Sequence, residues 1–214
     1  MESPKNIQEK EMLITEKDTA PNTDVYGKSN EEMMRKVLHC ISSKGECLLN
    51  NEVLENTPKR FLKAFYELTS GYFTDVKEMI TSAIFDAEGY DDIVIVDDIS
   101  FNSLCEHHLL PFTGKVTIGY LPDSKILGLS KFARLVEAFS KRLSLQERLT
   151  KEIACALDSN LLPKGVVVQI VAEHTCMGIR GVKCPGSKTK TIFTTGVFKT
   201  DESMLKRFTA LKNI

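Results

Sequence analysis

The chain has 214 residues, 42% of them hydrophobic and 27% charged, and a formal net charge of −1. This length and balance are typical of a globular protein with one substantial core and at most a small appended unit. A charge so close to zero gives no overall attraction to nucleic acid or to a membrane, so an anion would need a local cluster of cations. The sequence has no apolar run near the ~20 residues that span a bilayer and no signal-peptide pattern at its start, so we expect a cytoplasmic protein.

The N-terminal part predicts a tail followed by helices. Residues 1–28 are polar, charged and without periodicity, which is typical of a disordered tail. Apolar side chains recur at helical spacing over residues 34–41, which predicts an amphipathic helix. A second helix is predicted to begin at Thr57 and Pro58, an N-cap residue followed by proline, and to stop near Gly71.

From about residue 92 the pattern changes to that of strands. In chain order we expect strands at 92–96 and 114–120, helices over 130–139 (capped by Ser130) and 145–157, strands at 166–172 and 189–198, and a terminal helix at 201–211. This order favours an antiparallel α+β domain. We therefore divide the chain into a tail (1–28), a helical N-terminal region (29–90) and a domain that carries the chemistry (91–214).

Six cysteines do not imply disulfides here, because a chain of this length builds a core without them. We interpret Cys40, Cys47 and Cys155 as core or incidental thiols, and Cys184, beside proline and glycine, as an exposed loop thiol. The other two cysteines lie beside histidines, which suits metal binding.

Cys105, His108 and Cys176 look like three ligands of one zinc ion. Two thiolates and one imidazole leave the fourth tetrahedral position for water, which is the arrangement of a catalytic rather than a structural zinc. Bound zinc lowers the pKa of its water to roughly 7, so the pattern indicates metal-assisted hydrolysis. The alternative is a core cysteine beside a pair of surface histidines.

Two further histidines, His107 and His174, flank these ligands. Imidazole titrates near neutral pH, so both suit general acid and base catalysis. Either could instead hold a ligand in orientation.

A basic helix start is the second feature. Ser130, Lys131 and Arg134 would combine free backbone N–H groups with two cations, which is a phosphate site in outline. A solvated basic face is an equal alternative. Arg180, four residues after Cys176, could contact the same anion.

Gln146 and Glu147 open the next predicted helix. A first-turn glutamate is ordinary helix chemistry, but its carboxylate could also accept two N–H groups from the edge of guanine. Arg60 and Lys63 are neighbours on one helix face and are more often surface charges than ligands.

Residues 103–112, Ser-Leu-Cys-Glu-His-His-Leu-Leu-Pro-Phe, resemble GTP cyclohydrolase I. Residues 57–60, 128–131, 146–149 and 176–181 support the resemblance, which covers roughly residues 30–212. It implies the tunnelling fold, in which an antiparallel four-stranded sheet with two helices (ββααββ) follows a helical N-terminal region. It also implies a homodecamer of two pentamers with active sites between subunits.

The resemblance implies conversion of GTP and water to 7,8-dihydroneopterin triphosphate and formate, the first step towards tetrahydrofolate or tetrahydrobiopterin. Cys105, His108 and Cys176 would then be the zinc ligands, and His107 and His174 would move protons. The substrate would be held by Gln146 and Glu147 at guanine, and at the ribose and triphosphate by Ser130, Lys131, Arg134, Arg180, Arg60 and Lys63.

Two other functions compete with this interpretation. A related tunnelling-fold enzyme, such as a nitrile reductase, would use its cysteine as a covalent nucleophile with a nicotinamide cofactor and without zinc. A nonenzymatic assembly module would need zinc only for stability, so metal removal would unfold it and the two further histidines would be dispensable.

Overall fold

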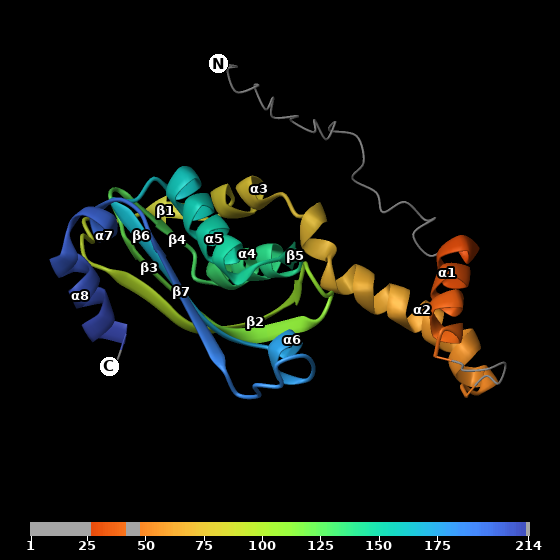
Figure 1. Cartoon of the computed structure of the whole chain (residues 1–214). Helices are drawn as coiled ribbons and strands as arrows, with labels where there is room; N and C mark the ends of the chain where they lie inside the picture. The colour runs from red at the N-terminus through yellow and green to blue at the C-terminus, as the bar shows by residue number, and fades with distance from the viewer. Residues whose placement is uncertain (1–26, 42–47, 213–214) are drawn as a thin grey trace, which may run out of the picture. The chain divides into compact units, whose positions relative to one another are not determined.

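The computed structural model describes residues 27–41 and 48–212 (Figure 1). The tail predicted at 1–28 falls almost wholly outside these residues, as does Cys47. The chain divides into two compact units, residues 1–63 and 64–214. In the described part of the chain, no helix is both long enough and apolar enough to cross a membrane.

The first unit contains helix α1 (Lys28–His39) and most of α2 (Asn51–Leu68). The helix predicted over 34–41 is confirmed, although α1 ends at His39. The start predicted at Thr57 was wrong, because α2 begins at Asn51, and Pro58 lies inside it. The side chain of Asn50 accepts a hydrogen bond from the backbone N–H of Val53 at 2.9 Å and caps the helix at that earlier point. The proline removes one backbone hydrogen bond from the helix but does not end it.

The second unit is built on one antiparallel sheet and two covering helices. Its main elements are β2 (Val94–Cys105), β3 (Pro111–Leu121), α4 (Ser130–Ser140), β5 (Leu143–Ser144), α5 (Gln146–Leu161), β6 (Gly165–His174) and β7 (Lys188–Thr194). The strand order is β5-β2-β3-β6-β7, and only the two-residue β5 is parallel to its neighbour. Figure 1 shows α4 and α5 on one face of this sheet. The predicted α+β fold of four long antiparallel strands and two helices is confirmed.

Shorter elements connect and extend this frame. They are η2 (Ser70–Phe73), α3 (Val76–Thr81), β1 (Ile84–Asp86), β4 (Lys125–Leu127), α6 (Thr175–Gly178), α7 (Val197–Thr200) and α8 (Glu202–Lys212). β1 and β4 form a separate two-stranded sheet. Apart from the terminal helix α8, these elements were not predicted, because segments this short do not show a measurable hydrophobic period.

The core lies between the sheet and the two helices. Leu135 of α4 and Ile153 of α5 are fully buried against Val116 and Ile170 of the central strands. Each such side chain stabilises the fold by roughly 1.5–3 kcal/mol relative to an exposed position. This packing holds the sheet rigid beneath both helices, and the site lies at one end of that layer.

A smaller apolar cluster covers part of the opposite face of the sheet, under α7 and α8. It includes Phe198 and Phe208, which are 2% and 1% exposed. The strand predicted over 189–198 was too long, since β7 ends at Thr194 and Gly196, at φ 50°, turns the chain into α7. Phe198 therefore packs from a helix and not from a strand.

The start of α4 also differs from its prediction. Ser130 is the first helical residue, Leu129 occupies the N-cap position, and no side chain caps the helix. The turn is closed instead by the backbone, with Lys131 N–H donating to the carbonyl of Gly128 at 2.9 Å. The Ser130 hydroxyl is thus not used as a cap.

Candidate metal centre and active site

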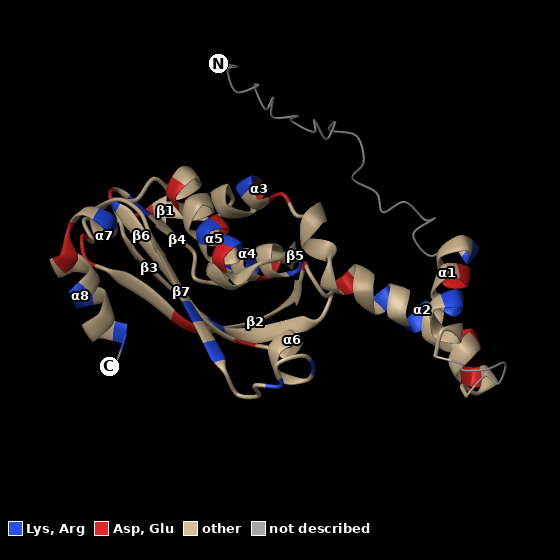
Figure 2. Cartoon of the chain, in the orientation of Figure 1, with Lys and Arg blue, Asp and Glu red and all other residues tan. Residues whose placement is uncertain are grey.

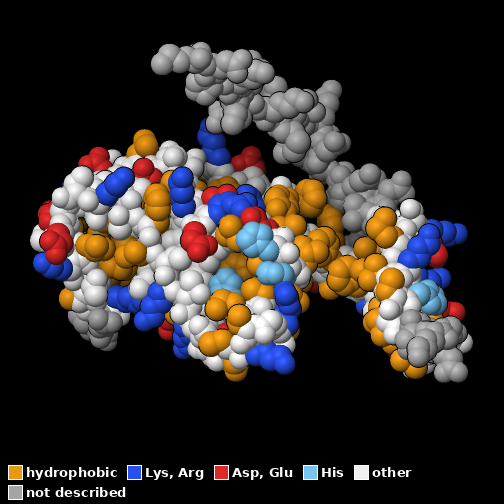
Figure 3. All heavy atoms as spheres, viewed as in Figure 1, with side chains coloured by type: hydrophobic (Ala, Val, Ile, Leu, Met, Phe, Trp, Pro, Cys, Tyr) orange, Lys and Arg blue, Asp and Glu red, His pale blue; other side chains and the backbone are white. Residues whose placement is uncertain are grey.

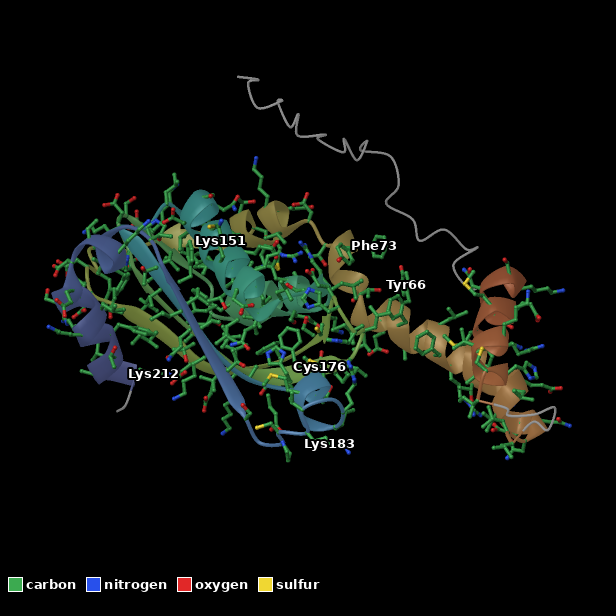
Figure 4. All side chains as sticks on the ribbon, viewed as in Figure 1. Tyr66, Phe73, Lys151, Cys176, Lys183 and Lys212 are labelled. Atoms are coloured by element: carbon green, nitrogen blue, oxygen red, sulfur yellow. The ribbon has the colours of Figure 1, made fainter. Side chains whose placement is uncertain are left out.

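Strand register brings the predicted site residues to one end of the sheet. Leu104 of β2 pairs with Pro111 of β3, and Phe112 of β3 pairs with His174 of β6. The carboxyl ends of β2 and β6 therefore lie on either side of the start of β3. Helix α6 follows β6 directly and carries Cys176 to the same place (Figure 4).

A tight turn between β2 and β3 folds His108 back onto Cys105. The backbone N–H groups of His108 and Leu109 donate to the Cys105 carbonyl at 3.2 and 2.8 Å, and Cys105 N–H donates to Leu110 O at 2.9 Å. Leu109 has a left-handed backbone, with φ at 55°. The turn leaves Nδ1 of His108 3.7 Å from Sγ of Cys105.

The ligand atoms of Cys105, His108 and Cys176 all lie within 4.8 Å of one another. Sulfur at ~2.3 Å and nitrogen at ~2.0 Å from a tetrahedral zinc would lie about 3.6 Å apart, close to the 3.7 Å observed between Cys105 and His108. Two sulfurs and one imidazole leave one position open. The three residues therefore fit a zinc ion that keeps room for water.

The surroundings of Cys176 favour its protonated thiol over the thiolate. Burial raises the pKa of Cys176, the neighbouring Cys105 raises it further, and Arg180 lowers it. A divalent cation between the sulfurs would favour both thiolates, since metal binding displaces the thiol protons.

His174 is held on two sides. Its ring stacks on Phe112, with centroids 4.6 Å apart and planes 4° apart. Its Nε2 lies 2.9 Å from Oε1 of Gln146. Burial lowers the pKa of His174, and the carboxylate of Glu147 acts in the opposite direction. Because its pKa is lowered from 6.5, the ring is mostly neutral at pH 7.

His107 is the more open of the two histidines. Its side chain is 62% exposed, and Nε2 lies 3.9 Å from Oε1 of Glu106. The same carboxylate forms an ion pair with Arg148 at the start of α5. His107 therefore lies beside the candidate ligand His108 with most of its side chain exposed.

These groups line one hollow of about 220 Å³. Its lining contains the three candidate ligands, both histidines and the first two residues of α5: Cys105, His108, Cys176, His107, His174, Gln146 and Glu147. Figure 3 shows histidine side chains gathered on this face among apolar side chains. One hollow thus brings together the three candidate metal ligands, two further histidines and a carboxylate.

Comparison with known proteins identifies the chain. The sequence model of the family described as GTP cyclohydrolase I matches residues 30–213. The chain belongs to this family. Its motifs predicted that relationship, and the prediction is confirmed.

Several relatives share close to half of their residues with this chain. GTP cyclohydrolase 1 of Streptococcus agalactiae serotype V is 51% identical over 174 residues, which is 80% of this chain and 91% of the relative. That of Gloeobacter violaceus is 50% identical over 155 residues, 72% of each chain. That of Dictyostelium discoideum is 44% identical over 195 residues, 87% of this chain and 84% of the relative. A solved structure, the apo archaeosine synthase QueF-Like, covers 49% of this chain and 93% of its own at TM-score 0.41 and 17% identity, too low to identify a fold.

The predicted anion-binding residues lie elsewhere in this chain. Ser130, Lys131 and Arg134, in the first turn of α4, do not line the metal hollow. Lys131 Nζ donates to Ser82 Oγ at 2.9 Å, and Arg134 lines a separate hollow of about 400 Å³ beside Gly71.

The remaining predicted cations lie in two different places. Arg180 follows α6 and is close enough to Cys176 to lower the pKa of its thiol. Arg60 and Lys63 belong to the first unit, where Arg60 forms an ion pair with Glu52 at 2.8 Å. One chain therefore assembles the metal end of the predicted site but not its whole set of cations.

Sequence reasoning missed several residues that shape the hollow. Phe112 stacks on the ring of His174. The ion pair of Glu106 and Arg148 connects the β2–β3 turn to α5. Thr150 donates a hydrogen bond to the backbone carbonyl of Gln146, and Thr191 accepts one from its side-chain amide. Only the position of Glu106 between Cys105 and His107 gave a signal.

Proposed function

We propose that this protein hydrolyses GTP to 7,8-dihydroneopterin triphosphate and formate, using zinc held by Cys105, His108 and Cys176. The observation that carries the proposal is the single hollow in which an open three-ligand metal site adjoins two histidines and a glutamate. Membership of the GTP cyclohydrolase I family supports the substrate. We further propose that the enzyme is cytoplasmic, that residues 91–214 form its catalytic domain, and that its product feeds tetrahydrofolate or tetrahydrobiopterin synthesis.

Zinc at this site would supply a water molecule that is acidic enough to provide hydroxide near neutral pH. The chain's own residues determine what that water can reach. Cys105 is buried at 6% exposure, and the ring of Phe112 beside it is fully buried. The hollow is therefore backed by buried side chains, and the low dielectric constant of such surroundings strengthens electrostatic contacts.

His107 and His174 divide the proton transfers between them. His107, exposed and next to the candidate metal ligands, donates a proton at N7 of the purine, which makes C8 more open to attack by water. His174, neutral and fixed, exchanges protons at the ribose during ring opening and rearrangement. The contrast between the two side chains supports this division: His107 is exposed and can meet the purine, whereas His174 is held by Phe112 and Gln146.

Glu147 provides the guanine contact. It is in the first turn of α5 and lines the hollow beside Gln146. A carboxylate accepts two parallel hydrogen bonds from N1–H and the exocyclic amine of guanine. Adenine has no N1–H, so the same carboxylate would reject ATP.

The triphosphate is held by cations from more than one copy of the chain. Ser130, Lys131 and Arg134 lie outside the metal hollow, so we propose that they complete the site of a neighbouring subunit. We propose that Arg180 contacts the anion from its own subunit and that Arg60 and Lys63 reach it from a second copy of the chain. Their positive charges oppose the roughly four negative charges of a triphosphate.

Open strand edges support such an assembly. Among the described residues, β7 pairs only with β6, and the outer edge of β2 pairs only at Leu104 and Cys105. Exposed backbone edges of this kind invite pairing with another chain. Basic residues lie along β7, the last strand in the order of the sheet (Figure 2). We propose the homodecamer of two pentamers that the family resemblance implies.

The two competing functions find less support. A covalent nucleophile would need a cysteine free of metal, whereas Cys105 lies in one cluster with His108 and Cys176. A purely structural zinc module would not need the hydrogen bond that Nε2 of His174 donates to Gln146, or the stacking of His174 on Phe112.

One assay tests the proposed function. Zinc-loaded protein is incubated with GTP, and the products are oxidised and examined for a fluorescent pterin and for formate. We expect both products with GTP, neither with ATP, and neither after treatment with a chelator. A zinc-loaded protein that forms no pterin would contradict the proposal.

A further inference from the structure

The polar groups beneath His174 form a closed and directional network. Gln146 is 1% exposed and Thr150 is 1% exposed, so water does not complete their hydrogen bonds. Nε2 of Gln146 lies 3.2 Å from Ile170 O, 3.1 Å from Thr189 O and 3.1 Å from Thr191 Oγ1. Buried groups of this kind must be matched donor to acceptor, so each bond in the network has a required direction.

The orientation of the Gln146 amide follows from its neighbours. Two of the three groups around Nε2 are backbone carbonyls, which only accept hydrogen bonds. The reversed amide would place an oxygen against both carbonyls and leave three acceptors in contact without a proton. The NH₂ group must therefore face the strands, and Oε1 must face His174.

Two threonine hydroxyls lock this orientation. Thr150 Oγ1 donates to the backbone carbonyl of Gln146 at 2.7 Å, so its one proton is used. Thr191 Oγ1, 2.6 Å from Thr150 Oγ1, must then be the donor of that pair. It is left as an acceptor for Nε2 of Gln146. The ring of bonds closes in one direction only.

The fixed orientation of the Gln146 amide determines the protonation of His174 through one hydrogen bond. Oε1 of Gln146 has no proton, so the Nε2 atom of His174, 2.9 Å away, must carry one. In the described part of the chain no group hydrogen-bonds to Nδ1 of His174. Stacking on Phe112 fixes the plane of the ring, and the bond to Gln146 fixes its rotation within that plane.

We propose that Gln146 is a positioning residue that holds His174 as the Nε2–H tautomer, so that Nδ1 is the nitrogen that exchanges a proton with the substrate. The Nε2–H bond to Gln146 fixes one nitrogen of the ring and leaves Nδ1 as the nitrogen that faces away from this network. Since both amide protons of Gln146 are already used within the protein, its side chain acts on His174 and not on guanine. This inference rests on the proposed function for the identity of the substrate.

The first test observes the proton directly. Metal-loaded protein labelled with ¹⁵N-histidine contains four histidines, and the His174→Asn variant identifies the His174 signals. We expect a hydrogen-bonded Nε2–H proton on His174 that exchanges slowly with water. In Gln146→Met, which keeps the length of the side chain, that proton should exchange rapidly. A proton on Nδ1 in the wild type, or slow exchange that persists in Gln146→Met, would overturn the inference.

The second test separates positioning from substrate binding. Gln146→Met should lower kcat by about 10- to 100-fold, as for other residues that orient a catalytic imidazole, and leave KM for GTP within about twofold. A raised KM with unchanged kcat would return Gln146 to guanine binding and overturn the inference.

Gln146→Met could fail to fold, so a matched pair of threonine variants tests the same hydrogen-bond network without changing Gln146. Thr191→Val removes one bond of the network and should lower kcat by up to about fivefold. Thr117→Val makes the same change at another buried threonine of the sheet, 4% exposed and bonded to Asp97, and should leave kcat unchanged. Equal effects of the two variants would contradict the network. Turnover of the wild type tests the proposed function, whereas the His174 proton tests this inference without turnover.

Discussion

The metal end of the site and the basic start of α4 show opposite kinds of organisation. Cys105, His108 and Cys176 are brought together by strand register and a tight turn, and the nearby His174 is fixed by buried hydrogen bonds. Lys131 and Arg134 lie on the surface, and neither contacts the metal hollow. Atoms that react must be placed to a fraction of an ångström, so one chain builds them into its core. Charges that hold an anion tolerate looser placement and can come from a neighbouring subunit.

The largest expected effect breaks the metal end. Cys176→Ser should reduce bound zinc to a small fraction of one ion per chain and abolish pterin formation, because a serine hydroxyl is a poor zinc ligand. Cys105 belongs to the core between the sheet and its helices and Cys176 packs against it, but most of that core is made of aliphatic and aromatic side chains, so the far-ultraviolet circular dichroism should stay unchanged. Cys184→Ser, at an exposed cysteine, is the matched control and should keep both metal and activity. Unfolding of the metal-free protein would instead favour the structural-zinc alternative.

The next effect concerns the basic end. Lys131→Ala and Arg134→Ala should each raise KM for GTP by about 10- to 100-fold, the loss expected for a hydrogen bond to a charged group. Zinc content should not change, since neither side chain lines the metal hollow. Lys151→Ala removes an exposed cation from α5 and serves as the control (Figure 4). If these variants bind GTP normally, the first turn of α4 is only a solvated basic face.

Mixing the two variants, at a GTP concentration well below the raised KM of Lys131→Ala, sharpens the comparison between the two ends. Cys176→Ser lacks the metal end and Lys131→Ala lacks part of the basic end. If the two ends of a site come from different copies, co-refolded mixtures should regain up to about one quarter of the wild-type activity in hybrid sites under random assembly. Mixtures no more active than the sum of the separate variants would place both ends in the same chain.

A smaller effect tests nucleotide selectivity. Glu147→Gln should weaken GTP binding by about 10-fold, because an amide offers one acceptor where the carboxylate offered two charged ones. The discrimination between GTP and ATP should narrow in the same variant. Equal affinity of wild type and variant, measured by calorimetry, would remove Glu147 from guanine recognition.

The smallest effect is in pH dependence. Burial lowers the pKa of His174 in the folded protein below its ordinary value of 6.5. The unfolded chain therefore binds this proton more readily, so the stability contributed by neutral His174 is present above pH 6.5 and is lost as the pH falls through the lowered pKa. The free energy of unfolding should fall less between pH 7.5 and 5 in His174→Asn than in the wild type. An identical pH dependence would show that burial does not act on this ring.

The sequence predicted the chemistry of the site better than its surroundings. Cys105, His108 and Cys176 were found because few other roles suit those residue types beside histidines. Their meeting required only that two strands end at the same edge of one sheet. Residue type and strand order together were enough for that part.

The rest depended on contacts that local patterns do not encode. Thr191 is an ordinary strand residue, and only its pairing opposite Ile170 places it under Gln146. The start of α2 shows the same limit for whole elements. Asn50 and Thr57 are both possible N-cap residues, and the local sequence alone did not show that the helix begins at Asn51 and continues through Pro58. Long-range partners therefore remained unpredicted where propensity was weak or divided.

The most direct test of the account is a crystal structure of the zinc-loaded protein, with the metal located by anomalous scattering. We predict one zinc at ~2.3 Å from the sulfurs of Cys105 and Cys176, at ~2.0 Å from Nδ1 of His108, and with water in the fourth position. A fourth protein atom bound to the metal, or a zinc that does not contact Cys176, would contradict the hydrolytic mechanism.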